Sequence, residues 1–355
     1  MKGLILSGGL GTRLRPLTFT QPKQVIPIAN KPTLFYAIEA MVKCNIREIG
    51  IIVGDRGPEV RNLVGDGSRW GATISYIYQG EPLGLAHAVK TARNFLGNDP
   101  FIMFLGDNLI NSGLGPVIEA FQQANAVILV SPVQDPSRYG IVELDGEMII
   151  SLVEKPQAPK SNLALVGVYA FDSNIFQAID LIKPSWRNEL EITDAIQMMV
   201  NMGFAVKPCL LSGWWKDTGK VEDILDANRL VLSQLQTRIE GVIDSATVIT
   251  GSVEISPTAR VTNCVIRGPV SIGEGAVINN TYVGPYTSLG NGVVCDGVEI
   301  ENSVVLENCL IKTVAERLDS CLLGRNARIL GHNRKPKVLS LILSDDSAVY
   351  CRHRE

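Results

Sequence analysis

The sequence predicts an α/β fold with a largely parallel sheet in its N-terminal part, followed by a parallel β-helix. From residue 1 to about 236, short apolar runs of strand length alternate with helical stretches. This pattern is typical of a parallel sheet with helices on both faces. From residue 243 on, aliphatic residues recur at intervals of six, as they do in stacked β coils. A chain of 355 residues also exceeds the roughly 250–300 that one core usually serves, so we expect two domains.

Composition and charge exclude several classes of function. The net charge of −3 leaves no basic surplus for nucleic-acid binding. No apolar run reaches the ~18 residues of a membrane span, and the N-terminus has the pattern of a strand rather than a signal peptide. The cysteines are scattered and form no Cys-x-x-Cys pair, which indicates reduced, buried thiols. We therefore expect a cytoplasmic protein with no nucleic-acid partner and no membrane partner.

The expected elements of the first domain, residues 1–236, follow from these patterns. Apolar runs predict strands at Leu4–Leu6, Ile49–Val53, Thr73–Tyr78, Phe101–Leu105, Ala126–Val130 and Leu165–Tyr169. Helical spacing predicts helices at Thr33–Lys43, Leu85–Phe95 and Leu114–Gln123, and a further helix at Val221–Gln236 that leads out of the domain. Ligands of such sheets bind beyond the carboxyl ends of the strands. Residues that directly follow a strand are therefore the candidates for a functional site.

The first strand runs into a glycine-rich stretch, Ser7–Leu17. Its glycines Gly8, Gly9 and Gly11 allow a sharp turn and can point successive backbone N–H groups at an anion. Arg13 and, a little later, Lys23 add positive charge. The combination indicates a turn that binds a phosphate chain.

Three different interpretations of this stretch compete with a phosphate-binding turn. A P-loop would close with Gly-Lys-Ser/Thr, and no such tripeptide follows. A dinucleotide fingerprint would need glycine where Leu14 stands, and Lys31-Pro32 lies near the spacing expected for its acidic residue. The third interpretation is a glycine-rich turn with a purely structural role.

Further candidates follow later strands. Gln79 offers both a donor and an acceptor, which suits the edge of thymine or uracil, and Gly84 opens a helix with a free backbone N–H. Asp107 stands at the carboxyl tip of a buried strand, and Asp217 follows two tryptophans. One or two protein carboxylates are what a phosphate-bound Mg²⁺ usually takes.

The middle of the domain offers residues for a sugar phosphate. Gly140 permits close backbone contact where a turn enters a strand. Glu154 and Lys155 are adjacent at a strand end, so their side chains should point to opposite faces and not simply pair with each other. Glu154 would accept from sugar hydroxyls and Lys155 would neutralise a phosphate. Glu191 would position sugar or basic groups, or alternatively cap the helix that follows it.

These motifs together resemble a known family. Gly-Gly-x-Gly-Thr-Arg-Leu at 8–14, Pro-Lys-Gln at 22–24, Lys-Pro at 31–32 and Glu-Ile-Thr-Asp at 191–194 are similar to the signature of sugar-nucleotide pyrophosphorylases. The first 235 or so residues resemble the glucose-1-phosphate thymidylyltransferases. The resemblance implies a Rossmann-like, mostly parallel mixed sheet, and it implies nucleotide contacts at Leu6, Gly8, Gly9, Gly11, Thr12, Arg13, Gln79, Pro82 and Gly84. It implies sugar-phosphate contacts at Lys23, Gly140, Glu154, Lys155, Val166 and Glu191, and Mg²⁺ ligands at Asp107 and Asp217.

The region 243–355, after a linker at 237–242, carries the six-residue repeat. The repeat positions are Ile243, Ile249, Ile255, Val261, Ile266, Ile272, Ile278, Val283, Leu289, Val298, Val304 and Leu310. The register slips around 261–266 and 278–298, and Leu318–Leu330 and Leu339–Val349 indicate less regular coils. The pattern resembles left-handed hexapeptide-repeat domains; a β-sandwich, the competing fold, would alternate strictly. Cys264, Cys309 and Cys321 stand at positions consistent with a stacked core.

This extra domain makes the chain similar to the long form of the family, which is associated with deoxysugar biosynthesis. Hexapeptide domains also occur as acyltransferases, whose sites usually need a histidine. The candidates are His332, in the basic stretch His332–Lys337, and His353, and neither lies in a convincing coil motif. We therefore expect a structural or oligomerising role, and a homo-oligomer.

The expected reaction joins dTTP and glucose 1-phosphate to give dTDP-glucose and pyrophosphate. Arg13 would neutralise the departing pyrophosphate, Lys23 would bring the two phosphates together, and Asp107 would hold the metal with Asp217. UTP could replace dTTP, because one methyl group is worth only ~1–3 kcal/mol of discrimination. The chain could also be a bifunctional nucleotidyltransferase/acyltransferase or a non-catalytic regulatory subunit, although such subunits usually lose the charged residues retained here.

Overall fold

The computed structural model describes residues 1–9 and 11–331. The chain divides into two compact units, and the division does not follow the sequence linearly. The first unit comprises Met1–Leu10, Gln21–Val25 and Thr33–Asp217. The second comprises Gly11–Thr20, Ile26–Pro32 and the chain from Thr218 on. The boundaries at 236 and 243 stay a prediction, since a compact unit is not by itself an independently folding domain.

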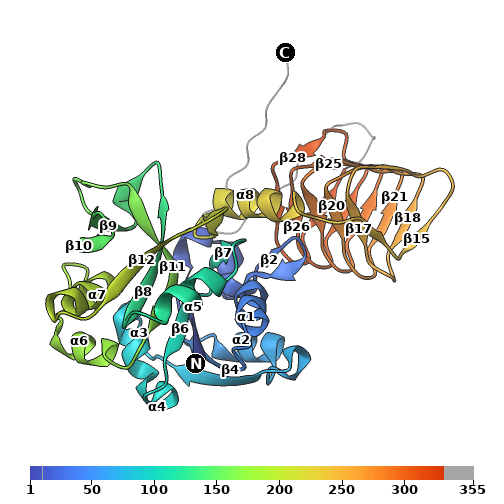
Figure 1. Ribbon diagram of the computed structural model, residues 1–355. Helices are drawn as coiled ribbons and strands as arrows, with labels where there is room; N and C mark the ends of the chain where they lie inside the picture. The colour runs from blue at the N-terminus through green and yellow to red at the C-terminus, as the bar shows by residue number, and fades with distance from the viewer. Residues whose placement is uncertain (10, 332–355) are drawn as a thin grey trace. The chain divides into compact units, whose positions relative to one another are not determined.

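A mixed sheet forms the centre of the first unit (Figure 1). Its strands are β1 (Lys2–Ser7), β4 (Glu48–Val53), β5 (Thr73–Tyr78), β6 (Phe101–Leu105), β8 (Ala126–Pro132), β9 (Gly140–Asp145), β10 (Met148–Glu154), β11 (Leu163–Phe171) and β12 (Val206–Leu210). The strand order is β10-β9-β11-β6-β1-β4-β5; β8 also pairs with β11, and β12 pairs with β8. The pairs among β6, β1, β4 and β5 are parallel, as is β12 with β8, while β11 is antiparallel to each of its neighbours. The Rossmann-like, mixed sheet is confirmed.

Helices cover both faces of this sheet. They are α1 (Thr33–Lys43), α2 (Gly57–Val64), α3 (Leu85–Thr91), α4 (Arg93–Leu96), α5 (Gly115–Phe121), α6 (Ile175–Leu181) and α7 (Ile192–Asn201). Alternate residues of β1 point to opposite faces, so Leu4 joins the core under α3, α6 and α7, while Ile5 joins the core under α1, α2 and α5. Both residues are fully buried. This double burial explains why the centre of the strand, Leu4–Leu6, is apolar at every position.

Two of the helices predicted beside the sheet differ in detail from the observed ones. The helix predicted at Leu85–Phe95 is two helices, because Ala92 departs from helical geometry at φ −81° and ψ 0°. The helix predicted at Leu114–Gln123 is trimmed at both ends to α5. The helix predicted at Thr33–Lys43 has the bounds of α1.

The second unit is dominated by a left-handed parallel β-helix, whose coils are stacked in Figure 1. One face consists of β14 (Arg238–Ile239), β17 (Val253–Ile255), β20 (Val270–Ile272), β23 (Thr287–Leu289), β26 (Val304–Val305) and β29 (Leu322–Leu323). A second consists of β15 (Val242–Ile243), β18 (Arg260–Thr262), β21 (Val277–Asn279), β24 (Val294–Asp296), β27 (Leu310–Lys312) and β30 (Arg328–Leu330). A third consists of β16 (Val248–Thr250), β19 (Val265–Arg267), β22 (Tyr282–Val283), β25 (Glu299–Glu301) and β28 (Leu318–Asp319). The predicted β-helix is confirmed; Leu339–Val349 and His332–Lys337 lie outside the described residues.

The interior of the coils follows the predicted repeat up to Leu289 and then departs from it. Ile278 stacks on Cys295, and Cys295 stacks on Ile311. The repeat predicted through Val298, Val304 and Leu310 is therefore one or two residues out of register. The cause is that some sides of the coil are five residues long instead of six, so a strict spacing drifts.

The remaining parts of the second unit are a helix and two short segments. Helix α8 (Val221–Leu232) ends before the predicted Gln236. The segment Gly11–Thr20 holds short 3-10 helices at Thr12–Leu14 and Leu17–Phe19. The segment Ile26–Pro32 is a hairpin of β2 (Pro27–Ile28) and β3 (Lys31–Pro32). Within the part of the chain that the structure describes, no helix is long and apolar enough to cross a membrane.

Candidate active site

The turn after β1 follows the C-terminal end of that strand, and β1 is parallel to both of its neighbours, β4 and β6. The turn therefore lies at the carboxyl edge of the parallel part of the sheet. Gly8 lies against the side chain of Gln79: a Cβ built on Gly8 would be 2.9 Å from Oε1 of Gln79. Such a Cβ would also lie 3.8 Å from the backbone nitrogen of Gly54. A side chain at position 8 would therefore displace Gln79, and glycine serves close approach here.

Gln79 follows β5 directly, and its amide is held by two neighbours. Nε2 donates to the carbonyl oxygen of Gly84 at 3.3 Å and lies 3.1 Å from Nδ1 of His87. Gly84 has φ 106°, and a Cβ there would collide with the backbone of Leu190. The structure thus brings Gly8, Gln79 and Gly84 together. No sequence pattern linked His87 to this group, and His87 orients the amide from α3.

Leu6 and Pro82 are the two other residues expected to contact the nucleoside end of the nucleotide. Leu6 is 7% exposed and belongs to the core beneath the turn, and its carbonyl oxygen accepts from the backbone N–H of Gly106 at 2.9 Å. Pro82 is exposed on the turn that precedes α3.

A cation and a carboxylate meet beside Gly9. Lys23 opens a short 3-10 helix, Lys23–Val25, and its Nζ is ion-paired with Oδ2 of Asp107. A Cβ built on Gly9 would lie 3.7 Å from that Nζ, so the ammonium lies against the glycine-rich turn. Burial works to raise the pKa of the Asp107 carboxyl, but the Lys23 ammonium outweighs it and holds that pKa below its usual value. Asp107 is therefore a carboxylate at neutral pH.

Asp217 lies near Asp107 because its short strand pairs with the strand that follows Asp107. Strand β13 (Trp215–Asp217) runs antiparallel to β7 (Asn108–Ile110), and Asp217 stands opposite Asn108. Asn108 is 3% exposed; its Nδ2 donates to Oδ1 of Asp107 at 3.0 Å, and its Oδ1 accepts from the indole N–H of Trp215. The two expected metal ligands are thus on neighbouring chain segments. Asn108 and Trp215 were not predicted, and only the tryptophan pair before Asp217 hinted at this packing.

The sugar-phosphate candidates gather at the start of β9 and the end of β10. Gly140 pairs with Glu154 in the antiparallel register, and a Cβ on Gly140 would lie 3.0 Å from Oε2 of Glu154. The Nζ of Lys155 lies 3.7 Å from Oε1 of Glu154. The expectation that these two side chains point apart is wrong, because β10 ends at Glu154 and Lys155 has φ 43°. In that left-handed conformation the alternation of a strand no longer applies.

Arg187, which the sequence analysis did not propose as a site residue, lies close to both Glu154 and Glu191. Arg187 Nη1 lies 3.4 Å from Oε1 of Glu154 and 3.4 Å from Oε1 of Glu191. Glu191 is buried and accepts from Ser185 Oγ at 2.8 Å. It occupies the N-cap position of α7 but makes no side-chain capping bond there. Burial raises the pKa of Glu154, with Lys155 opposing, and burial also raises the pKa of Glu191. The sequence offered no periodic signal for Arg187.

The remaining predicted contacts are placed as follows. Val166 is fully buried in the core, so its backbone is the part available to a ligand. Gly11, Thr12 and Arg13 belong to the segment Gly11–Thr20 of the second unit, where Thr12 and Arg13 are exposed in a 3-10 helix.

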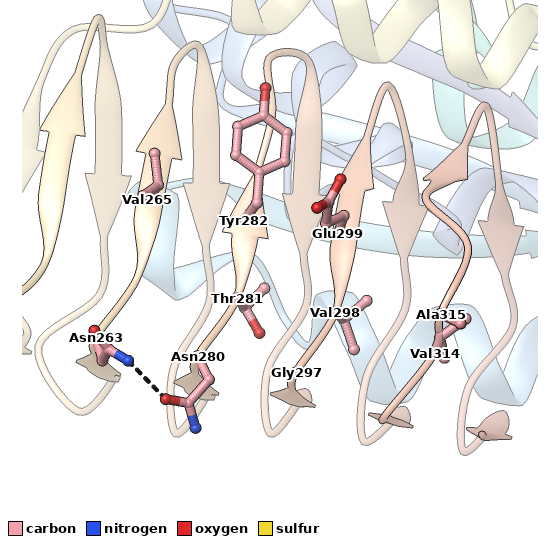
Figure 2. Close-up of a pocket in the computed structure, with 10 residues that line it drawn as sticks. All are labelled: Asn263, Val265, Asn280, Thr281, Tyr282, Gly297, Val298, Glu299, Val314 and Ala315. Atoms are coloured by element: carbon pink, nitrogen blue, oxygen red, sulfur yellow. Dashed lines mark hydrogen bonds between the residues drawn. The ribbon is translucent and has the colours of Figure 1, made fainter. Parts of the chain in front are cut away.

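The β-helix carries a hollow of about 400 Å³ on its third face (Figure 2). It is lined by Asn263, Val265, Asn280, Thr281, Tyr282, Gly297, Val298, Glu299, Val314 and Ala315. None of these described lining residues is a histidine, the residue that an acyltransferase site would need. His332 and His353 lie outside the described residues.

Comparison with known proteins covers both parts of the chain. The sequence model of the family described as nucleotidyl transferase matches residues 2–234. A glucose-1-phosphate thymidylyltransferase of Streptomyces antibioticus is 46% identical over 353 residues, which is 98% of this chain and 99% of the relative. The low-salt glycan biosynthesis nucleotidyltransferase Agl11 of Haloferax volcanii is 48% identical over 335 residues, covering 93% and 94% of the two chains.

A solved structure is similar to a large part of this chain. A Bacillus anthracis protein assigned as a glucose-1-phosphate thymidylyltransferase, in complex with sucrose, superimposes with a TM-score of 0.61. It is 36% identical, and the match covers 64% of this chain and 94% of that one.

Proposed function

We propose, for a chain that belongs to the nucleotidyl transferase family, that it joins dTTP and glucose 1-phosphate to give dTDP-glucose and pyrophosphate. The observation that carries this proposal is the ion pair of Lys23 with Asp107 against Gly9. It sets a cation and a carboxylate beside a glycine-rich turn at the carboxyl edge of the sheet. The full-length similarity to the Streptomyces antibioticus enzyme supports the same reaction.

The nucleotide is bound by the turn and by Gln79. The Gln79 amide, fixed by Gly84 and His87, offers the donor and acceptor that the edge of thymine requires. Backbone N–H groups of Gly8, Gly9 and Gly11 and the side chains of Thr12 and Arg13 receive the triphosphate. Leu6 and Pro82 complete the contacts of the nucleoside.

The sugar phosphate is bound at the group around Glu154. Glu154 accepts from the sugar hydroxyls, and Arg187 holds its carboxylate between Lys155 and Glu191. Lys155 lies beside it, supplying positive charge for the phosphate, and Gly140 and Val166 offer backbone groups. Burial raises the pKa of Glu154, and the positive charges of Lys155 and Arg187 oppose that rise in part.

The residues present fit a bound Mg²⁺. Asp107 and Asp217 stand on adjacent segments, and no cluster of three or more His, Cys, Asp or Glu side chains suited to a metal exists among residues 1–9 and 11–331. A pair of carboxylates is what a magnesium ion carried by substrate phosphates usually needs. When bound there, Mg²⁺ would neutralise charge on the triphosphate oxygens.

The reaction then needs no covalent intermediate on the protein. An anionic oxygen of glucose 1-phosphate attacks the α-phosphorus, forming the new P–O bond as the bond to the β-phosphate oxygen breaks and pyrophosphate leaves. Lys23 draws the two phosphates together, and Arg13 neutralises the departing pyrophosphate. Catalysis of this kind rests on positioning and electrostatics, and orientation alone can supply ~7–11 kcal/mol.

The proposal also covers the location, oligomeric state and pathway of the protein. We expect a cytoplasmic homo-oligomer whose product feeds deoxysugar biosynthesis, with no nucleic-acid and no membrane partner. Light scattering of the purified chain measures the oligomeric state.

The test is pyrophosphate release with dTTP, UTP and GTP, each paired with glucose 1-phosphate and glucosamine 1-phosphate. The expected result is the highest kcat/KM with dTTP and glucose 1-phosphate. Preference for UTP would establish a uridylyltransferase instead. Gln79 can bind either base, because thymine and uracil share the same hydrogen-bonding edge. Absence of release with every pair would overturn the proposal.

A further inference from the structure

The hairpin Ile26–Pro32 has a strained turn. Its two central residues, Ala29 and Asn30, have φ 48° and 61°, the geometry of a tight two-residue hairpin. Alanine is unfavourable in the left-handed region, because its Cβ comes too close to the following carbonyl oxygen. Such a conformation persists only where surrounding contacts impose it.

One source of those contacts is Asn228, on the buried side of α8. Asn228 is 1% exposed, and its Oδ1 accepts from the backbone N–H of Ala29 at 2.9 Å and from Ser288 Oγ at 2.7 Å. Its Nδ2 donates to the carbonyl oxygen of Tyr286 at 3.0 Å. Asparagine is a poor residue for a helix interior and for a core. A fully bonded buried amide does, however, specify a single arrangement of the parts it joins.

The second source is the side chain of Asn30 itself. Its Nδ2 lies 3.0 Å from Ser271 Oγ, 3.2 Å from the carbonyl oxygen of Ser271 and 3.0 Å from the carbonyl oxygen of Leu289. Ser271 and Leu289 belong to β20 and β23, neighbouring coils on the first face of the β-helix. Both central residues of the hairpin are therefore bonded within the second unit, Ala29 to Asn228 of α8 and Asn30 to two coils of the β-helix.

The segment Gly11–Thr20 is attached to the same body. Its Leu17 lies against Gly324 of the β-helix, where a built Cβ would be 3.2 Å from Leu17 Cδ2. Within the segment, Thr18 Oγ1 donates to the carbonyl oxygen of Gly11 at 2.7 Å. This segment carries Thr12 and Arg13, and the hairpin begins three residues after Lys23 in the chain.

We propose that the second unit positions the segment Gly11–Thr20, which carries the triphosphate-binding residues Thr12 and Arg13, together with the hairpin that follows Lys23 in the chain. Asn30 and Asn228 are the positioning residues of the hairpin. This inference rests on the proposed function. It assigns the C-terminal domain a part in nucleotidyl transfer, because both segments belong to the same compact unit as the coils. The sugar-phosphate group around Glu154 and Arg187 is held within the first unit and does not depend on this anchor.

The test compares Asn30→Gly with Asn302→Gly in the full-length chain. Glycine keeps the left-handed backbone at either position, φ 61° and 48°, so each change removes only a side-chain amide. The Asn302 amide donates instead to Asp319, at 3.0 Å, and serves as the matched control. Ser288→Ala is a milder second variant that removes one donor to Asn228 without altering the hairpin.

Asn30→Gly should raise the KM for dTTP about 10-fold and lower kcat about 10- to 100-fold, as a small misplacement of binding groups does. The KM for glucose 1-phosphate should stay unchanged. Ser288→Ala should raise the KM for dTTP in the same direction, and Asn302→Gly should change neither KM. A smaller folded fraction would lower kcat alone, so the rise in the KM for dTTP separates positioning from stability.

Hydrogen exchange supplies a readout that needs no activity. Peptides covering 11–20 and 26–32 should exchange faster in Asn30→Gly than in wild type, and as in wild type in Asn302→Gly. Unchanged exchange, or faster exchange with an unchanged KM for dTTP, would overturn the anchor while leaving the proposed function standing. A wild-type chain inactive with every nucleotide would overturn the proposed function and this inference together.

Discussion

The ammonium group of Lys23 is ion-paired with the carboxylate of Asp107, a residue 84 positions further along the chain. Both side chains are largely buried, at 16% and 13% exposure. A pair of this kind is costly to break from one side, because the remaining charge stays desolvated. Its position beside Gly9 therefore indicates a use beyond stability.

Replacing Asp107 by asparagine should remove most of the activity and weaken the response to magnesium. The change keeps the shape of the side chain but removes the charge that a metal ion needs, and loss of one such group typically lowers turnover by about 10²–10³. Turnover titrated with MgCl₂ measures both effects. Asp180→Asn is the control. Asp180 lies on α6 and forms partly exposed ion pairs with Lys90 of α3 and Arg93 of α4. A magnesium titration unchanged in Asp107→Asn would refute the ligand role.

Gly8→Ala should raise the KM for dTTP and leave the KM for glucose 1-phosphate unchanged. The new Cβ would lie 2.9 Å from Oε1 of Gln79, so the amide must move from the place where Gly84 and His87 hold it. We expect a loss of about 10-fold in kcat/KM, the value of one hydrogen bond of about 1.4 kcal/mol. Gly115→Ala is the matched control, since a Cβ there meets nothing within 4 Å. Equal kinetics of the two variants would remove Gln79 from base recognition.

Glu154→Gln should change how stability depends on pH. Burial raises the pKa of Glu154 in the folded chain above its ordinary value of 4.5. The stability that this group contributes is therefore complete below pH 4.5 and is lost as the pH rises through the raised pKa. Urea unfolding of both chains at pH 4.5 and above should show the variant gaining relative to wild type as the pH rises. A difference that is constant with pH would contradict the raised pKa.

Cys295 should resist alkylation in the folded protein. It is fully buried among the coils, and burial raises the pKa of its thiol to about 12. Because the thiolate is the reactive form, iodoacetamide at pH about 8 should leave Cys295 unmodified until the β-helix is unfolded. Mass spectrometry of tryptic peptides compares it with the half-buried Cys44. Modification of Cys295 at the rate of Cys44 would show that the coils open readily.

Much of the fold could be predicted because its signals are local. The apolar runs in β1, β4 and β6 are buried on both faces. Each run alone therefore predicts a strand in the interior of the sheet, whatever the rest of the chain contains. The candidate residues at the ends of these strands, Asp107 among them, could be found by the same logic. Glycine-rich spacing located Gly8 in the same way.

What could not be predicted depends on contacts between distant residues or on single dihedral angles. The pairing of Lys155 with Glu154 follows from one positive φ, which the sequence does not display. Arg187 and Asn108 gain their roles from partners on other strands. Cys295 lies six residues after Leu289, in register with the repeat, and was missed as an interior residue because the repeat was read from aliphatic side chains alone. The grouping of residues 26–32 with the β-helix depends on Asn228, which lies 199 positions after its partner in the hairpin.

The β-helix is a stack in which each coil contacts only its neighbours, so whole coils could in principle be added or removed during evolution. The bonds of Asn30 to Ser271 and Leu289 restrict where that can happen. A coil inserted between α8 and β20 would move these two residues along the stack and out of reach of the hairpin. A coil added beyond β29 and β30 would leave both bonds as they are. Length variation among relatives with this anchor should therefore accumulate at the far end of the stack, and a chimaera that only adds coils beyond β30 should keep full activity.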